Sequence, residues 1–163
     1  MAKVRYAYTP KNLDKAVRAM GYEMPISFKH AMEICRELKG KKIEEAKKYL
    51  EEVIAMKRAV PFRRHKKKVA HRRGLEGWYA GRYPQKAARY ILKVLKNLEA
   101  NADYKGLDKD ELVITHAQAK MGRKLKRYMP RAYGRATPRF KIYTTVEFVA
   151  EVAEVTEVTG KEA

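Results

Sequence analysis

Apolar residues recur at helical spacing in three stretches of the chain. The first stripe follows Ser27, a favoured N-cap residue, and Gly40 fits the position that ends a helix. The second begins near Lys42, and the third runs from Pro84 to just before Gly106. The pattern predicts three helices, with buried stripes made of Phe28, Ala31, Met32, Cys35 and Leu38; Ile43, Ala46, Leu50, Val53 and Ile54; and Ala87, Ala88, Ile91, Leu92, Leu95 and Leu98.

Alternating apolar and polar residues predict strands at residues 3–9, 112–121 and 140–152. Residues 10–25 contain two prolines and a glycine, which favour an irregular connection with at most one helical turn. The expected fold class is α+β, with three helices packed on a small antiparallel sheet. In the last strand, one face is expected to hold Phe140, Ile142, Val146, Phe148, Ala150 and Val152, and the other Lys141, Thr145, Glu147 and Glu151.

The connection between the last two strands, residues 122–139, is far longer than an ordinary hairpin loop. Such a segment is a functional loop, a disordered loop or a continuation of the hairpin. If it continues the hairpin, the tip falls near residues 129–133, and the strand from Leu112 to Pro130 spans roughly 60 Å at about 3.3 Å per residue. A globule of this size has a radius of gyration of roughly 15 Å, so we expect a projecting hairpin over residues 112–152.

Charge is concentrated in two segments. The 163 residues carry a net charge of +19, and the windows 57–73 and 120–141 each hold nine Lys or Arg and no acid. The rest of the chain is nearly neutral. Both windows also contain aromatic residues such as Phe62 and Tyr128, a mixture that suits RNA phosphates and stacked bases. A solvated surface or a disordered tail is the alternative interpretation of such charge.

Two segments lack any helical or strand period. Residues 63–83 hold three glycines and five aromatic or histidine rings, which predicts a basic insertion loop that becomes ordered on binding. Residues 153–163 are acidic and are expected to fray as a tail. We expect all 163 residues to form a single domain with these appendages.

The sequence contains no motif typical of an enzyme, a metal or cofactor site, or a membrane protein. The four histidines are scattered without metal-ligand spacing, Cys35 falls on an apolar helical stripe, and no phosphate-binding glycine motif occurs. Carboxylates mostly lie on helix faces beside lysines, as ordinary surface pairs. We therefore expect no catalytic residue, metal or cofactor. Neither a signal peptide nor a membrane span is predicted, which favours a cytoplasmic protein with no membrane partner.

A close resemblance to a known family rests on residues 125–138, whose sequence is LKRYMPRAYGRATP. This segment resembles the hairpin tip of the universal large-subunit ribosomal protein L22 family. Further similar motifs are LKGKK at 38–42, KAA at 86–88 and NLEANA at 97–102. The longer linkage at 63–83 indicates the archaeal and eukaryotic branch of that family.

The resemblance implies a structural, non-enzymatic protein of the large ribosomal subunit that contacts ribosomal RNA near the polypeptide exit port. It also implies a long hairpin that lines the exit tunnel and meets the nascent polypeptide. Neighbouring ribosomal proteins are expected partners, and homo-oligomers are not expected. The implied tunnel tip comprises Leu125, Arg127, Tyr128, Met129, Pro130, Arg131, Ala132, Tyr133, Gly134, Arg135 and Ala136.

Charge and resemblance together give a set of candidate RNA contacts. These are the histidines and basic residues of the two windows, with three cations near the start of the third helix. The tip arginines Arg127, Arg131 and Arg135 are left out of this set, because they could lie among RNA phosphates or face the tunnel lumen. The alternatives are a DNA-compacting or general nucleic-acid chaperone, and an RNA-modifying enzyme. The candidates are Lys57, Arg58, Arg63, Arg64, His65, Lys66, Lys67, Lys68, His71, Arg72, Arg73, Arg82, Lys86, Arg89, Lys120, Arg123, Lys124, Lys126, Arg139 and Lys141.

Overall fold

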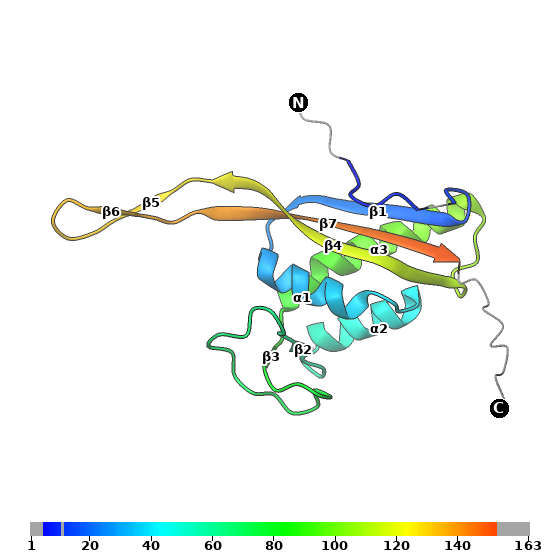
Figure 1. The fold of residues 1–163 in the computed structure, drawn as a ribbon, viewed down its shortest axis with the longest axis horizontal. Coiled ribbons are helices and arrows are strands. Elements are labelled where there is room, and N and C mark those ends of the chain that lie inside the picture. The colour runs from blue at the N-terminus through cyan, green and yellow to red at the C-terminus, as the bar shows by residue number, and fades with distance from the viewer. Residues whose placement is uncertain (1–4, 11, 153–163) are drawn as a thin grey trace, which may run out of the picture.

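The computed structural model describes residues 5–10 and 12–152, which form three helices and seven strands. The expected α+β class is confirmed (Figure 1). The helices are α1 (Phe28–Leu38), α2 (Ile43–Ile54) and α3 (Gln85–Lys105). The strands are β1 (Ala16–Met24), β2 (Val60–Pro61), β3 (Gly81–Arg82), β4 (Leu112–Leu125), β5 (Tyr128–Pro130), β6 (Ala136–Pro138) and β7 (Lys141–Val152).

The main sheet has the antiparallel order β1-β7-β4, so β7 is its central strand. Helix α3 packs on β1, α1 packs on β4, and α2 packs on α3 (Figure 1). The helices therefore cover one face of the sheet. This arrangement follows from the sequence, because each helix carries a single apolar stripe that must be buried.

All three predicted helices are confirmed, and their boundaries follow the expected signals. Ser27 is the N-cap of α1, although its side chain makes no capping hydrogen bond. Helix α3 begins at Gln85, one residue later than expected, so Pro84 is its N-cap and not its first residue. The helix ends at Gly106, whose φ of 68° is the left-handed conformation that glycine adopts without strain.

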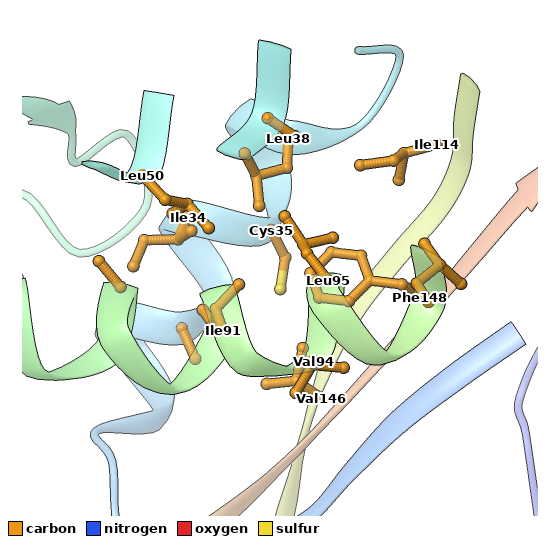
Figure 2. Close-up of a cluster of buried hydrophobic side chains, with 14 of the residues drawn as sticks. Ile34, Cys35, Leu38, Leu50, Ile91, Val94, Leu95, Ile114, Val146 and Phe148 are labelled. Atoms are coloured by element: carbon orange, nitrogen blue, oxygen red, sulfur yellow. The ribbon is translucent and has the colours of Figure 1, made fainter. Parts of the chain in front are cut away.

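The core lies between α1, α3 and the sheet. Ile34 of α1, Leu95 of α3 and Phe148 of β7 belong to one cluster of buried side chains, which Figure 2 shows, and all three are fully buried. Cys35 lies in the same cluster, where burial raises the pKa of its thiol to about 12. Cys35 is therefore a packing residue, as its position on the helical stripe predicted.

The prediction for the N-terminal region is wrong in two places. Residues 5–9 form no strand, and residues 3 and 4 lie outside the described part of the chain. The segment predicted to be irregular, 10–25, instead contains strand β1, which pairs with β7. Gly21 is needed in that strand because α3 passes close by: a Cβ atom there would lie 2.6 Å from a methyl carbon of Val94.

The face of β7 opposite the helices is also covered, by the N-terminal segment. The Tyr8 ring stacks on His116 of β4, and the backbone N–H of Ala7 donates to the carboxylate of Glu147 at 3.1 Å. Glu147 is fully buried and also contacts Lys120 Nζ at 2.6 Å and His116 Nε2 at 3.0 Å. Burial alone would raise the pKa of Glu147, but the hydrogen bonds from Lys120, Ala7 and His116 outweigh it and lower the pKa.

The long hairpin is confirmed and leaves the body along the direction of the sheet (Figure 1). Strand β4 is longer than predicted and pairs with β7 as far as Leu125 opposite Lys141. Beyond them β5 pairs with β6, and the chain reverses at Ala132–Arg135. The two central residues of this turn, Tyr133 and Gly134, both have positive φ, as the tight turns that match the strand twist require. The reversal therefore lies at the later end of the predicted tip.

Candidate nucleic-acid interface

The hairpin presents most of its cations without an acidic partner. Beyond the body, residues 131–140 are all exposed, and the ribbon carries no carboxylate between 120 and 141. Within residues 5–10 and 12–152, Lys120 is the one cation of this window that contacts a carboxylate, namely buried Glu147. Lys120 was predicted to contact RNA, but its ammonium group already has this internal partner. The other cations of the window keep their charge available to an external anion.

Aromatic side chains accompany the hairpin cations. The Tyr128 and Phe140 rings meet edge to face at 6.1 Å, and Lys124 lies over the Phe140 ring at 5.1 Å. A groove of about 720 Å³ runs beside them where β4 and β7 give way to β5 and β6. The groove is lined by Leu125, Arg127, Tyr128, Met129, Pro130, Arg139, Phe140, Lys141 and Tyr143. Exposed rings edged by cations are the side chains that stack with unpaired bases.

The basic loop 63–83 is held against the body by its own contacts. Strand β2 pairs with β3 at the two ends of the loop, and His71 bridges to Ala80 inside it. The indole N–H of Trp78 donates to the backbone oxygen of Phe62 at 3.0 Å. The sequence predicted a loop that becomes ordered on binding, whereas these contacts define its path within the protein itself.

Aromatic rings also hold the cations of this loop. Arg63 and Lys66 both lie over the Trp78 ring, at 5.9 and 5.5 Å from its centroid. Trp78 in turn stacks on Tyr79 at 5.1 Å. A cation that rests on a ring loses less conformational freedom when it binds an anion, so the loop is partly preorganised.

Glu33 of α1 is a functional candidate that the sequence reasoning missed. Its carboxylate is buried and accepts hydrogen bonds from the backbone N–H groups of Arg63, Arg64 and His65 at 3.2, 3.0 and 3.0 Å. The expectation that carboxylates form surface pairs is wrong for Glu33 and for Glu147. Glu33 fixes the start of the basic loop by occupying a run of backbone donors that would otherwise lack partners.

The remaining candidates lie on several parts of the molecule. Figure 1 shows the loop between β2 and β3 beyond the helices and away from the tip of the hairpin. Lys86 and Arg89 are exposed on the first turns of α3. Arg58 and Arg63 have acidic neighbours, Glu52 and Glu37, each at 3.5 Å. His65 is partly buried, and the other candidates of the first window are exposed.

In residues 5–10 and 12–152, no group of three or more His, Cys, Asp or Glu side chains is arranged to hold a metal ion. Over the same residues, none of the helices combines the length and apolar character that crossing a membrane requires.

Comparison with known proteins adds independent information. The family model described as "Ribosomal protein L22p/L17e" matches residues 19–151. A large ribosomal subunit protein uL22 from Archaeoglobus fulgidus is 74% identical over 152 residues, which cover 93% of this chain and 98% of the relative. Proteins of the same name from Methanothrix thermoacetophila and Methanocaldococcus jannaschii are each 53% identical, over 91% and 93% of this chain and 97% and 96% of the relatives.

Fold and surface define a basic α+β protein built around a projecting cationic hairpin. The family match covers most of that architecture, from β1 to the end of β7. The chain belongs to the ribosomal protein L22 family, in its archaeal and eukaryotic form. Its role is that of a structural, non-enzymatic component of the large ribosomal subunit, in the cytoplasm.

Proposed function

We propose that this chain binds large-subunit ribosomal RNA through both basic windows and lines the nascent-polypeptide exit tunnel with its hairpin tip. One observation carries the proposal: the hairpin projects from the body, and apart from Lys120 its cations have no acidic partner within the described residues. A two-stranded ribbon is marginally stable alone in water. Packed RNA phosphates on its flanks would neutralise its charge and hold its shape.

The two windows have different tasks in this proposal. The loop 63–83 and the exposed start of α3 fasten the body to the RNA surface, with cations held over rings such as Trp78. The hairpin enters between RNA segments, which its narrow two-stranded cross-section allows. Neighbouring ribosomal proteins would contact the remaining body surface, and a second copy of this chain is not required.

The tip is the part that would meet the nascent polypeptide. Tyr133 is 94% exposed at the turn, and the exposed arginines Arg131 and Arg135 flank it. A wall segment must contact passing chains without binding any of them tightly. A turn of exposed polar and small residues meets that requirement, because it offers contact without an enclosed pocket.

RNA binding is tested by the salt dependence of the affinity. Replacement of Lys66 and Lys67 by Gln is expected to flatten the plot of log affinity against log salt by about 1–2 units, because each lost phosphate contact removes roughly 0.7–0.9. The matched control, Lys48→Gln with Lys96→Gln, removes two exposed lysines outside both windows and should leave the slope unchanged. Equal slopes for both pairs would exclude the loop from the phosphate contacts. Equal competition by bulk DNA and by ribosomal RNA fragments would favour the general nucleic-acid chaperone instead.

Tunnel lining is tested in assembled subunits. A photo-reactive amino acid at Tyr133 is expected to cross-link to a stalled nascent polypeptide. The same group at Tyr104, which is 93% exposed near the end of α3, serves as the matched control and should give no such product. Cross-linking from Tyr104 alone would contradict the assignment of the tip to the tunnel.

A further inference from the structure

A small cationic cavity lies between the start of α1 and the basic loop. Its volume is about 290 Å³, and it draws on three segments that are distant in the sequence. Three of its residues, Lys29, His30 and Arg82, belong to neither basic window. The cavity is lined by Lys29, His30, Phe62, Arg64, His65, Lys67 and Arg82.

The lining carries four permanent positive charges and no carboxylate. Among the described residues, none of its Lys or Arg side chains forms a salt bridge. Glu33 is close in the chain to Lys29 and His30, but its two oxygens accept the backbone N–H groups at the start of the loop. Glu33 offsets at most one of the four positive charges, so the lining keeps an excess of positive charge, and an anion that entered would relieve the repulsion.

The two histidines give a second, independent indication of a ligand. His65 Nε2 is buried and has no hydrogen-bond partner among the described residues, a costly state for a ring nitrogen. The His30 and Phe62 rings form a T-shaped pair with their centroids 5.4 Å apart. Burial, and after it the charge of Arg82, lower the pKa of His30, so the ring is held neutral beside cations. A ligand with several acceptor atoms would satisfy such a lining.

We propose that this cavity binds one phosphate group, and that in the assembled protein the group is a backbone phosphate of a bound RNA strand. The inference rests on the proposed function and gives it a particular site. Phosphate oxygens accept hydrogen bonds from guanidinium, ammonium and imidazole groups at once. The N–H groups in the first turn of α1, near Lys29, add the favourable end of the helix dipole. The volume lies at the lower limit for small-molecule sites, which suits a phosphate better than a nucleoside.

The first experiment follows the histidine side-chain NMR signals of the full chain during titration with inorganic phosphate. Saturable shifts are expected for His30 and His65, with little change at His71 and His116, which do not line the cavity. Lys29→Gln should weaken phosphate binding about fivefold or more, since a charged hydrogen-bond donor is lost. Lys48→Gln, an exposed lysine of α2, is the matched control and should not change it. Equal, non-saturating shifts of all four histidines would overturn the site.

The second experiment separates free phosphate from RNA phosphate. A 12-nucleotide single-stranded RNA is added to the phosphate-loaded protein, and the same His30 and His65 signals are followed. Displacement of phosphate by RNA supports the proposal. Binding of RNA without displacement would overturn the RNA assignment while leaving RNA binding itself intact. Failure of RNA to bind at all would instead overturn the proposed function, and saturable phosphate binding would show that the cavity is a site for free anions only.

Discussion

The long hairpin has two parts, one packed in the body and one projecting from it, and different interactions stabilise each part. In the body, β7 lies between β1 and β4 under α1 and α3, and Phe148 is fully buried. Directly before the start of the same strand, Phe140 is 40% exposed, lies outside the buried core cluster, and meets Tyr128 and Lys124 of the ribbon. The hairpin continues from the body into the arm, but the hydrophobic core ends within the body. The body is therefore stabilised by burial, whereas the arm has only its ladder and its cross-strand pairs.

The largest expected effect comes from a direct comparison of these two phenylalanines. Phe148→Ala should lower the free energy of unfolding by about 3–5 kcal/mol, because it removes a fully buried ring and leaves a cavity. Phe140→Ala should lower it by less than about 1 kcal/mol, because that ring is already partly in water. Urea unfolding followed by circular dichroism measures both. Similar losses for the two variants would show that the arm shares the core of the body.

The next effect tests the buried carboxylate under the N-terminal segment. Glu147→Gln should cost about 2–3 kcal/mol, since Lys120 then loses its charged partner and the Ala7 N–H loses a charged acceptor. Glu151→Gln, at a partly buried carboxylate of the same strand, should cost much less. A loss for Glu151→Gln as large as that for Glu147→Gln would argue against the special role of the network.

The same carboxylate predicts a dependence of stability on pH. The pKa of Glu147 is lower in the folded protein than in the unfolded chain, so the charged form stabilises the fold above the unfolded pKa. That contribution should be lost as the pH falls through the folded pKa, which lies below the ordinary value of 4.5. Unfolding measured across this range should show a smaller loss of stability for Glu147→Gln than for the unmodified chain. Parallel curves would assign the acid sensitivity to other groups.

A smaller effect is expected where the body meets the basic loop. Glu33→Gln keeps the shape of the side chain but weakens three hydrogen bonds to the backbone of residues 63–65, at a cost of about 1–2 kcal/mol. Hydrogen exchange of those three amides should accelerate, while exchange in α3 should change little. Unchanged protection at residues 63–65 would mean that Trp78 and the β2–β3 pair suffice to hold the loop.

The smallest effect concerns removal of the arm. Deletion of residues 125–135 should change the free energy of unfolding of the body by less than about 1 kcal/mol, because this segment buries no side chain in the core. Thermal unfolding of the deleted and full chains provides the measurement. Loss of folding in the deleted chain would end the distinction between body and arm.

Periodicity in the sequence was enough to predict the three helices and the hairpin. Each helix has an apolar stripe that continues for several turns. Alternating residues on both sides of 122–139 predict the two strands that this segment connects. Strand β1 escaped prediction because it is interrupted by Gly21 and a register shift, and because its partner lies about 130 residues away. Residues 5–9 alternate as a strand does, yet they cross the face of the sheet without joining it.

The sequence by itself determined the charge, the helices and the length of the hairpin, since these depend on composition and on spacing between near neighbours. Only the tertiary structure decided which charged groups have partners within the protein and which are brought together. It placed Lys120 on Glu147, Glu33 under the basic loop, and Lys29 with His30 beside Arg64 and Arg82. Such pairings depend on segments that meet only after the chain has folded. Burial and the partners found after folding then set the free energy of each charged group, and adjacent residues in the sequence do not reveal either of them.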